Sequence, residues 1–221
     1  MNEEKRIQKE DELFRYAGED KIISSHELAN QLKDQKAPPR IKTGIPAMDR
    51  MLQDVEAGEL IIVTGPTGQG KTTLLMSITK NMADNNINSA WFTLEVTPRQ
   101  FIDKISSRGS LPLFYLPAKN TENHVQWLVE RITEAKIKYD VKVIFIDHLH
   151  QIFSIERMQG RSLSLEIGDV VAKIKQIAID YGLSIFMVAH NTDDKASPSR
   201  EPKMMDIRDS GMISRLADIV M

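Results

Sequence analysis

The stretch from Glu59 to Thr73 reads ELIIVTGPTGQGKTT, and it decides the fold. Its centre matches the pattern G-x-x-x-x-G-K-[ST] in full, through Gly65, Pro66, Thr67, Gly68, Gln69, Gly70, Lys71 and Thr72, with Thr73 next. An apolar run from Leu60 to Val63 precedes this pattern, and apolar residues at helical spacing follow it. A strand, a glycine-rich turn and a helix in this order form the context in which the pattern binds phosphate.

The residue types of this P-loop, residues 65–72, predict a nucleotide site. Glycines let the backbone fold around a phosphate with its N–H groups pointing inward, and the following helix adds its positive end. We expect the Lys71 ammonium to lie near the β- and γ-phosphates and the Thr72 hydroxyl to lie on Mg²⁺. The expected ligands are therefore ATP, or another nucleoside triphosphate, and Mg²⁺.

Composition narrows the class of protein. The 221 residues suit one α/β domain with a short appendage. The net charge of −2 gives no sign of nucleic-acid binding, so such binding would need a local basic patch or charges pooled across subunits. The absence of cysteine excludes a disulfide scaffold, a cysteine-based zinc finger and thiol catalysis. Apolar runs are too short to span a bilayer, so we expect no membrane partner and a cytoplasmic location.

Apolar strands alternate with amphipathic helices from residue 41 onward. Strands are expected near residues 60–63, 89–94, 113–116, 141–146, 184–189 and 217–221, and helices near 98–108, 121–139 and 167–181. This alternation predicts an α/β fold with a mostly parallel sheet and helices on both faces. Residues 1–40 are expected to form a helical arm or linker. Residues 41–221 are expected to form the ATPase domain, incomplete at its C-terminus because the chain stops within an apolar strand.

Three polar residues, Glu95, Asp147 and His190, directly follow predicted strands. Ligands of parallel sheets lie at the carboxyl ends of the strands, where these residues would meet the P-loop. Asp147 suits a Mg²⁺ ligand beside Thr72, and Glu95 suits the residue that polarises the attacking water. His190 suits a sensor of the γ-phosphate. The alternatives are an aspartate that caps a helix or stabilises a turn, a solvated glutamate at a strand end and a hydrogen-bonded structural histidine.

A pair of histidines near Asp147 raises the question of a second metal. His148 and His150 flank Leu149. A zinc site needs three or four converging ligands, and a P-loop metal already accounts for Asp147, so a second metal site is not favoured.

Several segments together resemble the RecA-like motor domain of DnaB-type hexameric replicative helicases. These segments are GPTGQGKTT, TLEV, VIFIDHLHQI, VAHN and DIRDSG followed by ADIV, and they stand in the order and spacing of that family. The segment TGIPAMDRML resembles the opening of the same domain. A histidine at position 190 is more similar to the phage and mitochondrial primase-helicases, because bacterial DnaB proteins usually have glutamine there. The resemblance covers about residues 41–221.

The resemblance implies an ATP-driven motor that encircles single-stranded DNA, moves along it and unwinds duplex DNA. By position, Lys71 and Thr72 would bind phosphate and Mg²⁺, Glu95 would activate water, Asp147 would hold the metal and His190 would couple the γ-phosphate to DNA. The implied DNA contacts come from channel loops and comprise Arg208, Asp209, Gly211, Lys195, Arg200, Lys203, Arg157 and Arg161. The implied partners are single-stranded DNA, further copies of the chain in a hexameric ring, and a primase or loader.

Two departures from the family keep other functions open. The family's arginine finger lies beyond the last strand seen here, which predicts weak hydrolysis, and residues 1–36 match the linker helix only loosely. One alternative is a RecA/RadA-like recombination ATPase that forms filaments, although residues 1–40 show no polymerisation motif and the DIRDSG segment argues against it. The other alternative is a nucleotide-binding fragment without turnover.

Overall fold

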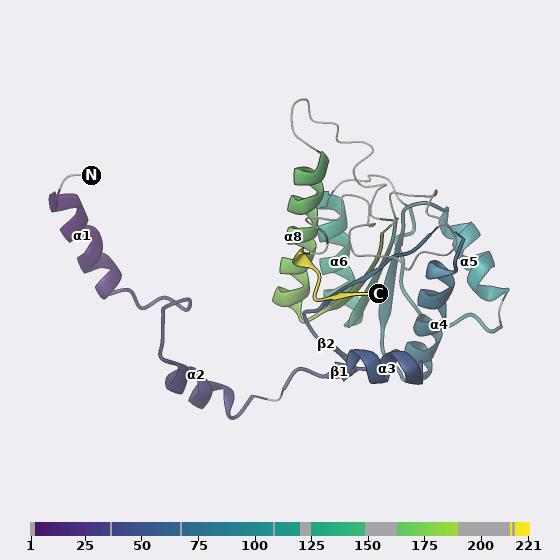
Figure 1. Ribbon diagram of the computed structural model, residues 1–221, viewed down its shortest axis with the longest axis horizontal. Coiled ribbons are helices and arrows are strands. Elements are labelled where there is room, and N and C mark those ends of the chain that lie inside the picture. The colour runs from purple at the N-terminus through teal and green to yellow at the C-terminus, as the bar shows by residue number, and fades with distance from the viewer. Residues whose placement is uncertain are drawn as a thin grey trace. The chain divides into compact units, whose positions relative to one another are not determined.

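A five-stranded parallel sheet forms the centre of the computed structural model (Figure 1). Its strands are β4 (Ser89–Thr93), β5 (Val143–Asp147), β6 (Ser184–Val188), β3 (Leu60–Val63) and β7 (Ile219–Val220), in that spatial order. Each neighbouring pair runs parallel. The prediction of a parallel sheet is confirmed. Because β3 lies between β6 and β7, the P-loop leaves an inner strand of the sheet.

The structure describes residues 3–35, 37–66, 68–107, 109–119, 125–148, 163–189, 213 and 215–221. Contacts divide the chain into an N-terminal unit, Met1–Ala37, and a sheet unit, Pro38–Met221. The division into residues 1–40 and 41–221 made from the sequence remains a prediction of domain organisation. Among the described residues, no helix combines the length and the apolar character that crossing a bilayer requires.

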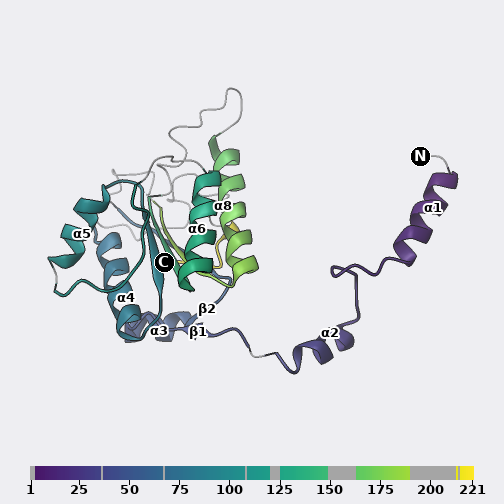
Figure 2. The ribbon, with the colours of Figure 1, turned by 180° about the vertical axis from the view of Figure 1, so that it is seen from behind.

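Helices cover both faces of the sheet (Figures 1 and 2). Helices α4 (Lys71–Asp84) and α5 (Pro98–Ser106) lie on one face, and α6 (Val125–Tyr139) and α8 (Leu163–Tyr181) lie on the other. Successive strand residues point to opposite faces, so Trp91 and Phe145 pack with α4 and α5, whereas Phe92 and Ile144 pack with α6 and α8. Burial on both faces explains why these strands read as nearly continuous apolar runs.

Two short features differ from the expectations. The prediction of a strand at residues 113–116 is wrong, because only Tyr115 pairs there, through a single bridge to Ala90. Pro112 and Pro117 flank this segment and have no N–H group for a longer ladder. An antiparallel pair, β1 (Arg40–Ile41) and β2 (Val55–Glu56), was not predicted, since two-residue strands carry no periodic pattern.

Other boundaries shift by a few residues. Helix α3 (Pro46–Leu52) begins at a proline, and α5 begins after Thr97, whose hydroxyl and backbone form a capping box with Gln100. Helix α5 ends at Ser106, two residues before the predicted end. Strand β5 includes Asp147 as its last residue.

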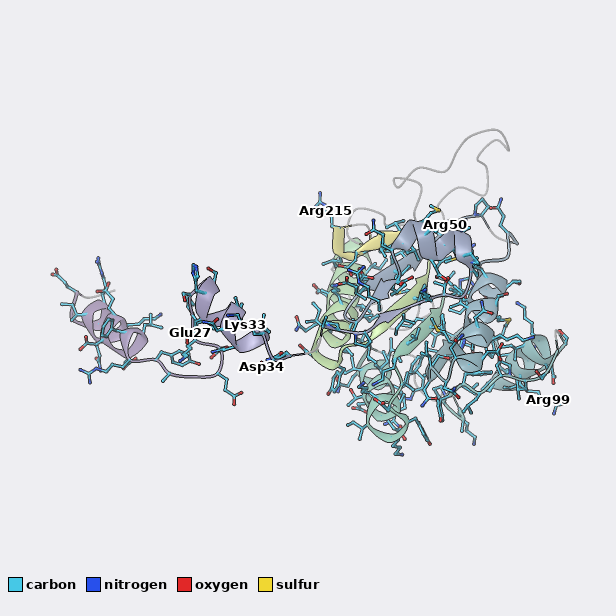
Figure 3. The ribbon with its side chains drawn as sticks, turned by 90° about the horizontal axis from the view of Figure 1, so that it is seen from below. Glu27, Lys33, Asp34, Arg50, Arg99 and Arg215 are labelled. Carbon is cyan, nitrogen blue, oxygen red and sulfur yellow. The ribbon has the colours of Figure 1, made fainter. Side chains whose placement is uncertain are left out.

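The N-terminal unit contains α1 (Glu3–Phe14) and α2 (Ser25–Leu32). The Ser24 hydroxyl accepts a hydrogen bond from the Glu27 N–H at 3.1 Å and so caps α2. Helix α2 has no buried residue, and its apolar Leu28 and Leu32 are exposed. Figure 3 labels Glu27, Lys33 and Asp34 on the same segment. Within the described residues, this unit therefore has no hydrophobic core of its own.

Candidate nucleotide site

The P-loop turns from β3 into α4 through left-handed backbone at Gly68 and Gly70, whose φ angles are +81° and +87°. Residues with a side chain adopt such angles only with strain, so both positions need glycine. Gly70 is the N-cap of α4 and offers no side-chain cap. The first N–H groups of α4 are therefore available to an anion, with the positive end of the helix behind them.

The Lys71 ammonium lies inside the loop that it follows. Its Nζ donates hydrogen bonds to the carbonyl oxygens of Gly65, at 2.7 Å, and Pro66, at 2.9 Å. The backbone carbonyl groups of the loop thus hold the positive charge of Lys71 within the loop that would bind a phosphate group. Both bonds go to neutral carbonyls, and phosphate oxygens would be stronger acceptors for this ammonium.

The Thr72 hydroxyl donates a hydrogen bond of 3.0 Å to Asp147 Oδ2, which joins the start of α4 to the end of β5. Asp147 is buried, and burial raises the pKa of its carboxyl group, while His148 and the Thr72 hydroxyl pull that pKa back down. Among the described residues, Asp147 Oδ1 accepts no hydrogen bond, and His148 Nε2 lies 3.4 Å from it.

This arrangement fits Mg²⁺. A hydroxyl and a buried carboxylate are oxygen ligands of the kind that Mg²⁺ prefers, and the orphaned Oδ1 would gain a partner in a bound cation. In the part of the chain that the structure describes, no group of three or more His, Asp and Glu side chains forms a metal site. The remaining ligands of the ion would therefore come from phosphate and water.

Glu95 meets Asp147 through His148. The ends of β4 and β5 are adjacent, because the Leu94 N–H donates to the Asp147 carbonyl at 3.2 Å. His148 Nε2 lies 2.6 Å from Glu95 Oε2, within hydrogen-bonding distance. His148 has a φ angle of +68°, an uncommon conformation for a residue other than glycine. This turn of the backbone places the buried imidazole between the two carboxylates.

A cavity of about 250 Å³ joins these groups. The P-loop and the start of α4 contribute Gly68, Gly70, Lys71, Thr72 and Thr73 to its lining. Glu95, His148 and Lys104 line it from the ends of β4 and β5 and from α5. Lys104 was not singled out from the sequence, because helical spacing does not tell which way an exposed lysine points.

A second, mostly apolar cavity of about 490 Å³ adjoins the P-loop. It shares Gln69, Gly70 and Lys71 with the loop, and its apolar lining comes mainly from α3 and α4. The apolar side chains in this lining are Met48, Met51, Leu52, Val63, Leu74 and Met221. The P-loop therefore separates a polar cavity from an apolar one.

The family model described as the DnaB-like helicase C-terminal domain matches residues 40–116 and 112–221. The chain belongs to this family. The predicted resemblance to the DnaB-type motor domain is thus confirmed.

Curated relatives of this DnaB-like domain include replicative helicases. The chain is 27% identical over 222 residues to the replicative DNA helicase DnaB of Rickettsia conorii, and the match covers 82% of this chain and 44% of that protein. It is 25% identical over 231 residues to the replicative DNA helicase DnaC of Bacillus subtilis, covering 91% and 51%. The DNA repair protein RadA of Halalkalibacterium halodurans is 24% identical over 174 residues, with 78% and 36% covered. The chain spans about half or less of the length of these relatives.

Solved structures agree on the fold of the DnaB-like domain. A solved ATPase domain superposes with a TM-score of 0.69 at 16% identity, covering 88% of this chain and 79% of that chain. A DnaB-like replicative helicase, solved in a study of its interactions with primase, superposes with a TM-score of 0.71 at 17% identity, covering 99% and 60%. These similarities confirm the predicted RecA-like fold.

Several predicted residues of the DnaB-like domain lie outside the described part of the chain. They are Thr67, His190, Arg157, Arg161, Lys195, Arg200, Lys203, Arg208, Asp209 and Gly211, and their roles remain predictions. The residue before His190 is described: the Ala189 N–H donates to the Val63 carbonyl at 3.0 Å. The chain therefore leaves β6 beside the strand that carries the P-loop.

Proposed function

We propose that this domain is the ATP-hydrolysing motor of a replicative DNA helicase, which moves on single-stranded DNA and unwinds duplex DNA. One observation carries the proposal: Thr72, Asp147 and Glu95 converge beside the P-loop in a chain whose family model spans both of its halves. Nucleotide hydrolysis needs these three kinds of group within one site.

In the proposed complex, Lys71 exchanges the carbonyl oxygens of Gly65 and Pro66 for β- and γ-phosphate oxygens. The first N–H groups of α4 bind the phosphates from the other side. Thr72 and Asp147 would hold Mg²⁺ directly or through water, and a bound ion would supply positive charge to balance the charge that develops on the phosphates. Asp147 binds the cation in its ionised form.

Glu95 acts as the general base in the proposed hydrolysis. A water oxygen attacks the γ-phosphorus while Glu95 takes its proton; the bond from the γ-phosphorus to the bridging oxygen breaks, and ADP leaves. The Glu95 side chain is about half exposed, so the base needs another group to fix its position. The contact of 2.6 Å to His148 Nε2 supplies it.

The nucleoside part of the proposed substrate lies in the apolar cavity beside the P-loop. Methionine side chains are flexible and polarisable, and they pack well against aromatic rings. Apart from Lys71, which is proposed to bind phosphate, Gln69 and Thr64 supply the polar side chains in this lining, so we expect weak discrimination among bases.

The proposed partners are single-stranded DNA and further copies of this chain in a hexameric ring. Basic residues in the predicted channel loops, Arg208 among them, would contact DNA phosphates, which makes binding fall with rising salt concentration. The DnaB-like replicative helicase among the structural neighbours interacts with primase, and we propose a primase or loader as a further partner of this domain, acting in the cytoplasm.

The similarity to RadA favours a second candidate function, that of a recombination ATPase that forms filaments. Negative-stain images of the protein with ATP and single-stranded DNA separate the two candidates, because the helicase proposal requires rings and the recombination proposal requires filaments.

The proposed motor function is tested by the ATPase rate of the full chain with and without single-stranded DNA, together with its mass from light scattering. We expect DNA to stimulate turnover in a hexamer-sized species, and Glu95→Gln to lower the rate at least about a hundredfold while nucleotide still binds. A monomer that binds ATP and whose turnover DNA leaves unchanged would overturn the motor proposal in favour of a nucleotide-binding fragment.

A further inference from the structure

A second lysine lines the phosphate cavity in addition to the P-loop lysine. Lys104 lies on α5, nine residues after Glu95, and borders the cavity together with Thr72, Glu95 and His148. Its side chain is exposed, and within the described residues its ammonium forms no hydrogen bond or ion pair. Nothing in the P-loop pattern accounts for this cation.

Helix α5 is held firmly against the sheet. Phe101 is fully buried, and its ring centroid lies 4.7 Å from that of Trp91 in β4. Ile105 is buried one residue after Lys104, and the Thr97–Gln100 capping box fixes the first turn. The backbone of Lys104 is therefore placed by packing on both sides of it, and only the flexible end of the side chain is free to move.

The charges around α5 leave Lys104 available to a ligand. The neighbouring carboxylate, Asp103, is paired with Arg99 at 3.0 Å on the exposed side of the helix. Figure 3 shows Arg99 at the outer edge of the sheet unit. On the cavity side, Lys104 shares the cavity lining with Thr72 and Glu95.

We propose that Lys104 binds an oxygen of the γ-phosphate from α5 and makes the site prefer nucleoside triphosphate to diphosphate. This inference rests on the proposed nucleotide-hydrolysing function. Glu95 must lie near the attacking water and hence near the γ-phosphate, and Lys104 enters the cavity together with Glu95. Lys71 lies in the loop that also holds the β-phosphate, so its contact persists in the diphosphate complex.

The Lys104 contact therefore exists only before hydrolysis. When the γ-phosphate leaves, α5 loses the Lys104 bond to the nucleotide, whereas the P-loop keeps its own bonds. A hydrogen bond between an ammonium and a phosphate oxygen is strong enough to change affinity by about tenfold or more.

The test is the binding of fluorescent ADP and of a β,γ-imido triphosphate, both with Mg²⁺, to the full chain. We expect Lys104→Ala to weaken triphosphate binding about tenfold while changing ADP binding less than about twofold, and Lys104→Arg to restore most of the loss. The matched control is Lys80→Ala, an exposed lysine on α4 that lines a different cavity and should change neither affinity.

The outcomes separate this inference from the function on which it rests. Equal losses for both nucleotides, or no loss for either, with wild-type binding intact, would overturn the role of Lys104 and leave the proposed function standing. The nucleotide site itself is refuted if the wild type binds neither nucleotide, or if the Lys71→Ala variant binds both nucleotides as tightly as the wild type does. In either case the inference about Lys104 is refuted with it. Thermal unfolding of each variant checks that the fold is kept.

Discussion

The two carboxylate oxygens of Asp147 have different surroundings. Oδ2 accepts the Thr72 hydroxyl, while Oδ1 accepts no hydrogen bond among the described residues. A buried oxygen without a hydrogen bond costs stability on the order of 1 kcal/mol or more. Such a residue makes the nucleotide-free protein less stable than its packing allows, and a bound cation would remove that cost.

We expect Asp147→Asn to stabilise the nucleotide-free protein and to abolish Mg²⁺-dependent nucleotide binding. Burial raises the native pKa of Asp147, so the stability contributed by its acid form is complete below the ordinary pKa of aspartate and is lost as pH rises through the raised value. Asparagine stays neutral throughout. The gain in the free energy of unfolding should therefore grow with pH, which urea unfolding between about pH 4 and pH 8 measures.

The control for this prediction is Asp84→Asn, an exposed aspartate at the end of α4. It should show no comparable gain at any of these pH values. A constant gain for Asp147→Asn across the range, or a loss that deepens as pH rises, would contradict the burial argument.

Residues at the ends of strands were the predictable part of the site. Glu95 and Asp147 follow apolar runs, and the carboxyl ends of parallel strands share one edge of a sheet, so their proximity follows from the pattern. The contacts of His148 and Lys104 did not follow from it. The φ angle of +68° at His148 directs its imidazole, and the packing of α5 directs Lys104. Neither feature leaves a periodic signal in the sequence.

At the scale of the element, α5 packs mainly through Phe101, whose ring contacts Trp91 and Phe114. We expect Phe101→Ala to lower the free energy of unfolding by about 3–4 kcal/mol, because the substitution opens a cavity against Trp91. Urea unfolding followed by tryptophan fluorescence measures the change. Arg99→Ala on the exposed side of the same helix should cost less than about 0.5 kcal/mol.

The result for Phe101→Ala would be informative beyond stability. If the variant unfolds like the wild type, α5 is not held by this contact, and the placement of Lys104 loses its support.

Long elements were predicted well, and short ones were not. Helices α4 and α5 carry an apolar stripe together with a start signal, and β5 is an unbroken apolar run, so composition and period agree. The strand expected near Tyr115 failed because the prolines beside it remove N–H donors that hydrophobicity does not register. Strand ends depend on single hydrogen bonds and so shifted by a residue or two.

At the scale of the whole molecule, the described residues of the N-terminal unit include exposed apolar side chains and form no core that buries them. Ile22 is fully exposed and Phe14 is 91% exposed, and α2 presents Leu28 and Leu32. An exposed apolar set of this kind indicates an interaction surface. We propose that it binds a neighbouring copy of the chain and so stabilises the ring.

Deleting residues 1–36 should therefore reduce the hexamer-sized species to monomers or small oligomers, as measured by light scattering with Mg²⁺ and a non-hydrolysable nucleotide. The double substitution Leu28→Glu and Leu32→Glu should act in the same direction. Glu27→Gln with Lys33→Gln, polar changes on the same segment, serves as the control and should leave the mass unchanged. An unchanged oligomer after the deletion rules out this role.

Strand β3, which precedes the P-loop, is synthesised early, but the strands that pair with it are synthesised late. Both neighbours of β3, namely β6 and β7, come from the second half of the chain, and the Leu60 N–H bonds the carboxylate of Asp218, 158 residues further on. Contacts of such long sequence separation form slowly. On the ribosome, β3 must therefore wait for nearly the whole of this sequence before it is paired on both sides. We therefore expect the phosphate-binding loop to form late in folding, and until β3 is paired on both sides its apolar residues are exposed to chaperones and to aggregation.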